Sequence, residues 1–153
     1  MPVSSDEKPA RLLAVCISDG GVPKYPIQRG EVTADGIVGD RHAHAKHIRP
    51  DRAISLFDVE ILEQLNREGF NLQFGTAGEN LTVEGLFVQR LASGTRLRIG
   101  EVELRLEQPR KPCYVLDKID PRLKEAIVGR CGYMASVVKT GEVHPSAAIE
   151  IVH

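Results

Sequence analysis

The chain has 153 residues, of which 42% are hydrophobic and 27% are charged, and its formal net charge is −1. This length and composition are typical of one folded domain, whose core must be aliphatic because aromatic residues make up 5% and Trp is absent. The near-neutral charge argues against a nucleic-acid-binding surface, and no apolar run approaches the length of a membrane span.

The cysteines and the N-terminus indicate a cellular location. Cys16, Cys113 and Cys131 form an odd set with no CxxC pair and no zinc-ribbon spacing, which favours a reducing cytoplasm. The first residues contain no apolar segment that would predict a secretory signal. We therefore expect a cytoplasmic protein in which residues 1–10 are a flexible N-terminus and residues 11–153 form a single domain.

The first half of the chain alternates apolar runs with turns. These runs predict strands over residues 12–18, 27–34 and 52–57. A long polar loop without hydrophobic periodicity is predicted between Gly36 and Asp51. Asp58 has the character of a helix N-cap, which predicts a helix over residues 59–68 that ends at Gly69 and packs one apolar face on a sheet.

Strand and turn signals dominate from Phe70 onward. They predict strands over residues 81–83, 86–91, 96–99, 102–107, 133–138 and 147–152. A second short helix is predicted, with Asp120 as its N-cap, Pro121 in its first turn and Gly129 at its end. Since no strand-helix-strand rhythm is visible, we expect a mostly β fold, namely an antiparallel β-barrel with a few short α-helices.

The polar stretch from Asp40 to Arg52 is rich in cations. It contains four Lys or Arg residues against two acids, a formal balance of +2 without its three histidines. Arginine side chains and backbone N–H groups after Gly36 and Gly39 would suit a phosphate. A solvated loop with weak ion pairs explains the same composition, and the local sequence does not decide between the two.

The histidines of this stretch raise a second interpretation. His42, His44 and His47 superficially resemble the His-x-His-x-Asp-His motif of metallo-β-lactamase-type hydrolases. Lys46 stands where that motif has its aspartate, and a cation at that position opposes a second metal ion. The sequence therefore disfavours a zinc site.

Cys113 follows two cations, Arg110 and Lys111, in a run bounded by prolines. Nearby cations favour the thiolate, which is the form that attacks electrophiles or binds soft metals. The alternative is a small apolar residue at the end of a strand. A cysteine protease is disfavoured, because the sequence places no histidine base near this thiol.

A glycine-flanked run from Gly75 to Leu81 contains a further candidate, Asn80. Its amide both donates and accepts hydrogen bonds, which suits either the edge of a heterocycle or a contact that closes a loop. The two glycines of the run permit backbone turns that other residues resist. On its own this signal is weak.

Five runs in order resemble the MOSC domain, a family named after the C-terminal domain of molybdenum cofactor sulfurases. They cover residues 36–42, 52–56, 78–86, 94–100 and 108–113. The resemblance extends from about Leu12 to the C-terminus. It implies a MOSC-type β-barrel that binds the molybdenum cofactor, as do family reductases of N-hydroxylated bases and amidoximes.

The resemblance also implies roles for individual residues. In those reductases the matching cysteine binds molybdenum, so Cys113 is expected to be a metal ligand or a sulfur carrier, and the catalytic residue. The basic and polar groups expected to bind the cofactor are Arg41, His42, Arg52, Asn80, Arg110 and Lys111. The expected partners are a small-molecule substrate and an electron-donor protein, with no nucleic acid and no membrane.

Two other functions stay open. The first is a non-catalytic carrier of the molybdenum cofactor or of another phosphorylated heterocycle such as pyridoxal phosphate, although no lysine has a recognisable Schiff-base setting. The second is a structural barrel in which Cys113 is no more reactive than an ordinary thiol. A molybdenum-dependent oxidoreductase or a sulfur-transfer protein is the leading expectation.

Overall fold

The computed structural model describes residues 9–41 and 50–153. The strands in these ranges are β1 (Arg11–Ile17), β2 (Tyr25–Ile27), β3 (Gly30–Thr33), β4 (Gly36–Ile37), β5 (Ile54–Asp58), β6 (Leu81–Glu84), β7 (Arg96–Ile99), β8 (Val102–Pro109), β9 (Tyr133–Lys139), β10 (Gly141–Val143) and β11 (Ile149–Val152). The helices are α1 (Val59–Arg67) and α2 (Leu123–Ala126), with 3-10 helices η2 (Pro50–Arg52), η3 (Val88–Arg90) and η4 (Tyr114–Lys118). None of the helices in these two ranges has the length and apolar character to cross a membrane. The prediction of a mostly β fold with short helices is confirmed.

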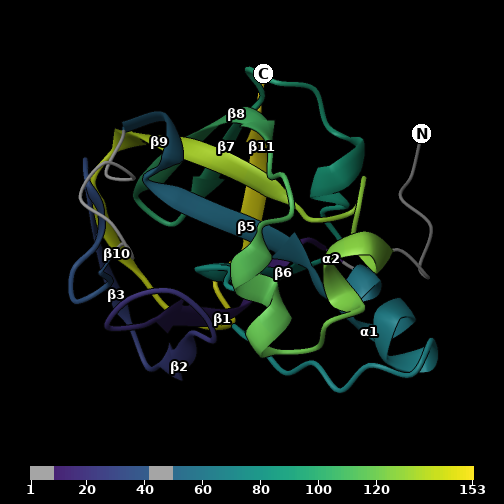
Figure 1. Cartoon of the computed structure of the whole chain (residues 1–153). Helices are drawn as coiled ribbons and strands as arrows, with labels where there is room; N and C mark the ends of the chain where they lie inside the picture. Colours follow the sequence, from purple (N-terminus) through teal and green to yellow (C-terminus); the bar gives the residue numbers. More distant parts are fainter. Residues whose placement is uncertain (1–8, 42–49) are drawn as a thin grey trace, which may run out of the picture.

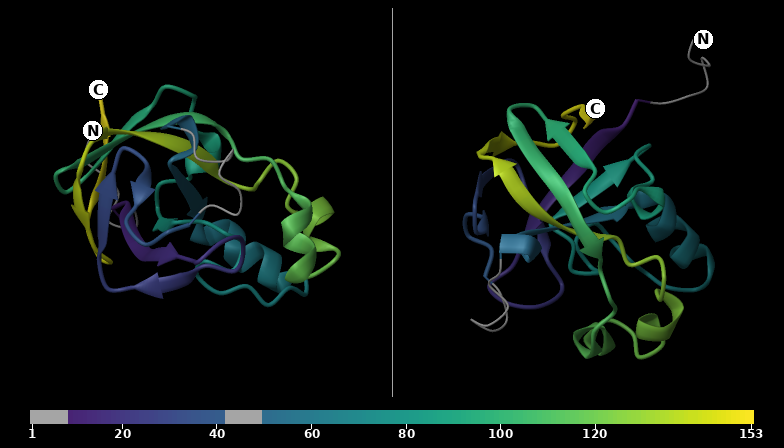
Figure 2. Two further views of the ribbon diagram at one scale, coloured as in Figure 1. Left: turned by 60° about the vertical axis from the view of Figure 1, so that its left-hand side comes forward. Right: turned by 90° about the horizontal axis from the view of Figure 1, so that it is seen from above.

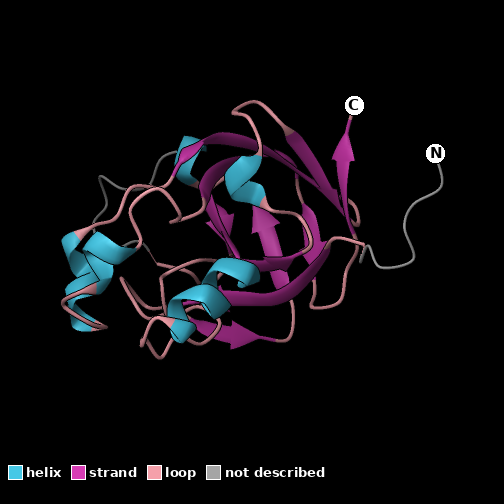
Figure 3. Ribbon diagram, turned by 90° about the vertical axis from the view of Figure 1, so that its right-hand side faces the viewer, coloured by secondary structure: helices cyan, strands magenta, loops and turns pink. Residues whose placement is uncertain are grey.

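The strands form two sheets (Figure 1). The larger has the order β11-β7-β8-β9-β5-β6-β1-β2, and the smaller has the order β10-β3-β4. Among the described strand pairs, only β5 and β6 run parallel, and α1 lies in the crossover that such a pair requires. The strands curve around a common centre, and the helices lie on the outside (Figure 3).

The predicted barrel is not confirmed. The larger sheet ends at β11 on one side and at β2 on the other, and no ladder between described strands closes it. Backbone hydrogen bonds do tie the start of β1 to the segment before β11, for example from Leu12 N–H to the Ala147 carbonyl at 2.8 Å. Arg11 and Ala148 form an isolated bridge. The sheet therefore curls back on itself without forming a continuous barrel.

Alternation of side chains gives strand β5 two different faces. Leu56 lies in the main apolar cluster, whereas Phe57 lies in a second cluster. Ser55 shares the side of Phe57, because successive side chains point to opposite faces of a strand. Its register partner on β9 is Met134, which in turn pairs with Gln108 on β8. A row of three side chains thus crosses three adjacent strands on the face opposite the main core.

Two apolar clusters stabilise the fold. The main cluster contains residues of both sheets and is aliphatic apart from Tyr133. The second cluster contains Leu62 and Leu65 of α1, together with Phe57 of β5 and Leu123 of α2. Two further views show both helices on one side of the sheets (Figure 2). The predicted one-sided packing of the first helix is confirmed.

Several element boundaries differ from the prediction. The strand expected over residues 27–34 is two strands, because Ile27 pairs with Val15 of β1 whereas β3 pairs with β10 in the other sheet. The strand expected over residues 52–57 begins at Ile54, after η2. The segment expected to be a strand over residues 86–91 contains η3 instead, and the second helix covers only Leu123–Ala126.

Asp58 precedes α1 but does not cap it with its side chain. Its carboxylate instead accepts hydrogen bonds from the backbone N–H groups of Val88 at 2.8 Å and Gln89 at 3.1 Å, so it caps η3. Burial raises the pKa of Asp58, and these two backbone hydrogen bonds oppose that rise. The predicted N-cap position of Asp58 is confirmed, but its carboxylate is used by a segment distant in sequence and not by α1.

Candidate functional site

A pocket of about 350 Å³ opens on the outer face of the larger sheet. The row of Ser55, Met134 and Gln108 forms part of its wall. Segments before β2, after β4, before β6 and after β8 provide the remaining lining. Its apolar lining residues include Val22, Pro109, Val115 and Met134. The pocket therefore forms where segments far apart in the sequence meet at the sheet.

Six of the seven residues singled out from the sequence line this pocket. Arg41 follows β4, Arg52 ends η2 and Asn80 precedes β6. The others follow β8, and the complete set is Arg41, Arg52, Asn80, Arg110, Lys111 and Cys113. His42 lies outside the described residues. The fold brings the six together, and their roles toward a ligand stay predictions.

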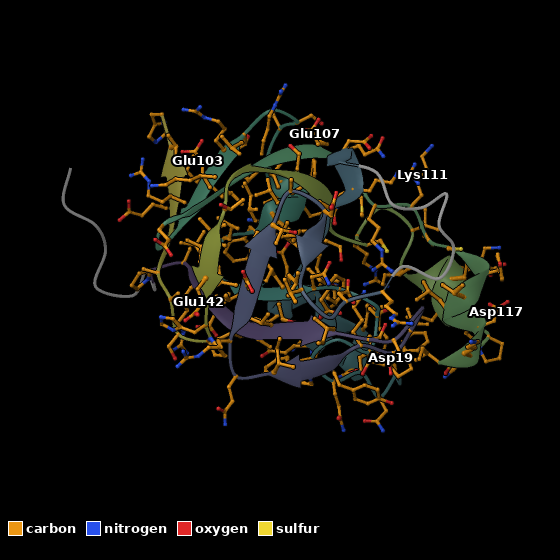
Figure 4. All side chains as sticks on the ribbon, turned by 90° about the vertical axis from the view of Figure 1, so that its left-hand side faces the viewer. Asp19, Glu103, Glu107, Lys111, Asp117 and Glu142 are labelled. Atoms are coloured by element: carbon orange, nitrogen blue, oxygen red, sulfur yellow. The ribbon has the colours of Figure 1, made fainter. Side chains whose placement is uncertain are left out.

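The pocket is rich in positive charge. Arg41, Arg52, Arg110 and Lys111 form no ion pair with any acid in the described part of the chain. No carboxylate occurs among its described lining residues. Figure 4 shows Lys111 at the surface, at the end of the molecule away from Glu142. Cations of one sign around a concave site attract anions, so the arrangement favours a phosphate-bearing ligand.

Two guanidinium groups of the pocket are incompletely hydrogen-bonded. Arg52 Nε and Arg110 Nη1 are buried, and neither has a hydrogen-bond partner among the described residues. Buried donors in folded proteins are nearly always paired with protein, water or ligand. An oxyanion in the pocket would provide acceptors for both groups, and hydrogen bonds between ions are among the strong ones.

The run from Gly75 to Asn80 positions two of the pocket's cations. Gly78 has φ +93°, and a Cβ there would lie 2.8 Å from Arg110 Nη2. The missing side chain lets the Arg110 guanidinium lie against the backbone. Gly75 has φ +84°, and its backbone lies against the Lys24 carbonyl where a Cβ would clash. The Lys24 N–H donates to the Gly75 carbonyl at 2.8 Å, which fixes this contact.

Glu79 is a buried acid in the same run. Its Oε2 accepts a hydrogen bond from Thr82 Oγ1 at 2.8 Å, whereas its buried Oε1 has no partner among the described residues. Burial raises the pKa of Glu79, while the positive charge of Arg110 lowers it. Glu79 therefore lies within electrostatic reach of the pocket although it does not line it.

Lys24 and Asp40 form a buried ion pair that the sequence analysis does not single out. Lys24 Nζ lies 2.7 and 2.8 Å from the two carboxylate oxygens, and the two side chains are 12% and 3% exposed. Asn80 Nδ2 donates to Asp40 at 2.9 Å and to the Cys16 carbonyl at 3.1 Å. Asn80 Oδ1 accepts from Ser55 N–H at 3.0 Å. No local motif marks Lys24, because its partner lies 16 positions away.

Cys113 differs in its surroundings from the other two cysteines. It lies partly exposed in the pocket, in extended conformation directly before η4. Cys16 and Cys131 are buried, and none of the three forms a disulfide. Burial raises the pKa of Cys16 to about 12 and also raises the pKa of Cys131, where the charge of Arg110 acts in opposition. Cys113 is therefore the thiol that a ligand in this pocket can reach.

The described residues contain no group of three or more His, Cys, Asp or Glu side chains that could hold a metal ion. The histidines of the zinc interpretation, His42, His44 and His47, lie outside the described residues. Within the described lining, the protein offers a metal one thiol, that of Cys113. This donor set suits a metal that arrives with other ligands already attached.

Comparisons with known proteins identify the family of this chain. The model of a protein family described as the MOSC domain matches residues 43–150. Protein YiiM of Escherichia coli (strain K12) is 34% identical over 130 residues, which cover 79% of this chain and 58% of that protein. A protein of Gibberella moniliformis named "Reductase" is 28% identical over 129 residues, or 78% of this chain and 23% of that protein.

The fold is also shared with solved structures. The crystal structure of YiiM from Geobacillus stearothermophilus has a TM-score of 0.78 at 24% identity, covering 95% of this chain and 76% of that chain. The chain spans less than two thirds of the length of the curated relatives it matches. The matched residues 43–150 include Arg52, Asn80, Arg110 and Cys113.

Proposed function

This chain belongs to the MOSC domain family, and on that premise we propose that its pocket binds the molybdenum cofactor with Cys113 as a ligand of the metal. The observation that carries the proposal is the presence of two buried guanidinium donors, without partners among the described residues, in the same pocket as an accessible thiol. The donors belong to Arg52 and Arg110. A phosphorylated pterin provides acceptors for them, and a thiolate is a suitable ligand for a soft metal centre.

The residues present fit this cofactor. Its metal would arrive held by the sulfur atoms of the pterin, so the protein would need to supply only one further ligand, and the described lining of the pocket contains one thiol. Arg41, Arg52, Arg110 and Lys111 would hold the phosphate and the polar edge of the pterin. When bound, the cofactor supplies two-electron oxygen-atom transfer.

The chain's own residues would bind and orient the cofactor and shield it from water. Arg52 and Arg110 fix the direction of the anionic group, since a guanidinium presents its donors in a rigid plane. Val22, Pro109, Val115 and Met134 reduce the access of water on the apolar side of the pocket. Asn80 has its amide engaged by protein groups, so we assign it to the support of the wall and not to direct contact.

The activity that we propose is reduction of N-hydroxylated compounds in the cytoplasm. In this reaction a hydroxylamine, two electrons and two protons give an amine and water, so the N–O bond is cleaved and the substrate is reduced. The electrons would come from an electron-donor protein. The relative named "Reductase" supports this class of chemistry, and three cysteines without a disulfide suit a reducing compartment.

Other uses of the same pocket are less well supported. A sulfur carrier would hold its sulfur on Cys113, and a non-catalytic carrier would bind the cofactor without turnover. Pyridoxal phosphate would find cations for its phosphate but a poor Schiff-base lysine, because Lys24 Nζ is ion-paired with Asp40 and Lys111 is exposed.

The proposal is tested by cofactor analysis of the protein made in cells with an intact cofactor pathway. We expect molybdenum by mass spectrometry and oxidised pterin by fluorescence, in near-equal amounts per chain. The proposal would be contradicted if the protein contained neither molybdenum nor pterin when made in cells whose reference molybdoenzyme is loaded with the cofactor. Turnover of N-hydroxyadenine with a chemical reductant then separates a reductase from a carrier, because a loaded carrier shows none.

A further inference from the structure

We propose that Asp40, which does not line the pocket, is the positioning residue that assembles its anion-binding side. The inference rests on the proposed function only in that the pocket binds a phosphate-bearing ligand. Asp40 connects three lining residues: Lys24, Arg41 and Asn80. The connections to Lys24 and Asn80 are direct hydrogen bonds, and the one to its chain neighbour Arg41 runs through Ser18.

The first connection is the ion pair with Lys24. Both Asp40 oxygens accept from Lys24 Nζ, at 2.7 and 2.8 Å, and the Asp40 side chain is 3% exposed. A buried charge is stable only with a well-placed partner. Asp40 therefore fixes the lysine side chain at the pocket and offsets its charge, so that the uncompensated cations are the arginines and Lys111.

The second connection is to Asn80. Its Nδ2 donates to Asp40 Oδ2 at 2.9 Å, and its Oδ1 accepts from Ser55 N–H at 3.0 Å. Asn80 thus links Asp40 to strand β5 at Ser55, which lines the pocket. The orientation of the amide depends on both partners, because reversing it would set donor against donor at Ser55 and acceptor against acceptor at Asp40.

The third connection concerns Arg41. Ser18 N–H donates to Asp40 Oδ1 at 3.0 Å, and Arg41 N–H donates to the Ser18 carbonyl at 2.8 Å. Two hydrogen bonds therefore fasten residues 40–41 to Ser18 at the end of β1. This attachment sets the point from which the Arg41 side chain enters the lining of the pocket.

Charge and geometry predict opposite effects for the loss of this carboxylate. If Asp40 only lowered the positive potential of the pocket, its removal would release Lys24 and strengthen anion binding. If Asp40 positions the three residues, its removal weakens anion binding although the net charge becomes more positive. The sign of the change therefore separates the two roles.

The test is Asp40→Asn, with binding of inorganic phosphate to the cofactor-free protein followed by NMR titration. We expect a loss of affinity of at least about tenfold, in a protein whose circular dichroism matches that of the native chain. Asp19→Asn is the control, because it removes the same charge from an exposed residue two positions before the lining residue Gly21, and we expect it to bind as the native protein does. Unchanged or stronger binding by Asp40→Asn would overturn the inference.

A second variant covers the case in which Asp40→Asn does not fold. Asn80→Ser cuts the link from Asp40 to Ser55 without changing any charge, so positioning predicts weaker phosphate binding. Native affinity in this variant would refute the inference. A native protein that binds no phosphate at all would overturn the proposed function as well, which distinguishes the two failures.

Discussion

Arg52→Met and Arg110→Met are each expected to weaken phosphate binding by about 10- to 100-fold. Both arginines have a buried donor without a partner among the described residues, and both line the pocket. A hydrogen bond to a charged group contributes about 1.5–3 kcal/mol, and every 1.4 kcal/mol is a factor of about ten in affinity. Methionine keeps much of the side-chain volume, so the loss reports mainly on charge and donors. The measurement is an NMR titration of the cofactor-free variants.

The control for these two variants is Arg67→Met. Arg67 is an exposed cation in the last turn of α1 and does not line the pocket. The substitution removes the same charge as the two test variants. We therefore expect phosphate affinity within about twofold of native at moderate ionic strength, where distant charges are screened. Equal losses in all three variants would mean that overall charge, and not the pocket, governs binding.

Gly78→Ala is expected to reduce phosphate affinity through Arg110 and to destabilise the fold. A Cβ at this position lies 2.5 Å from Val22 Cγ1 and 2.8 Å from Arg110 Nη2, and the backbone has φ +93°. Both side chains, which line the pocket, must therefore move. The positive φ alone costs an alanine on the order of 1–2 kcal/mol. Unfolding by urea gives the stability change, and phosphate titration gives the change in affinity.

Gly94→Ala provides a matched control for this strain. Gly94 has φ +90°, and nothing lies within 4 Å of an added Cβ. Both variants therefore share the cost of the left-handed backbone, whereas only Gly78→Ala displaces Arg110 and Val22. We expect Gly94→Ala to lower stability and leave phosphate affinity unchanged. Loss of affinity in both variants would show that destabilisation, and not the position of Arg110, is the cause.

Local patterns predicted most strands of this fold but not how they pair. The apolar run around Val15 forms a buried strand as expected, since its hydrophobic character is a local property. The strand predicted over residues 27–34 fails because its two halves pair in different sheets. Asp58 occupies the N-cap position of α1 as predicted, yet its carboxylate binds the first N–H groups of η3, which begins 30 positions later. Partners distant in sequence decided both cases, and closure of the sheet depends on such partners too.

The residues of the candidate site, too, were predicted where a local motif marks them and missed where distant partners place them. Arg52, Arg110 and Cys113 belong to runs whose order resembles a family, and the fold does bring them to one pocket. Lys24 was not predicted, because it lies in a segment without a motif and acquires its place through contacts with Gly75 and Asp40, which are distant in sequence. Asn80 was predicted as a ligand-binding group, but the structure shows that protein partners use its amide. Spacing alone could not reveal that, because Cys16 and Ser55 come from other strands.

The central claim is that Cys113 is a ligand of molybdenum in the pocket. X-ray absorption at the molybdenum edge measures the sulfur neighbours of the metal in the loaded native protein and in loaded Cys113→Ser. We predict one sulfur neighbour fewer in Cys113→Ser. Cys131→Ala alters a buried cysteine, and we expect it to have the same number of sulfur neighbours as the native protein. The same number of sulfur neighbours in native protein and Cys113→Ser, at equal molybdenum content, would contradict the claim.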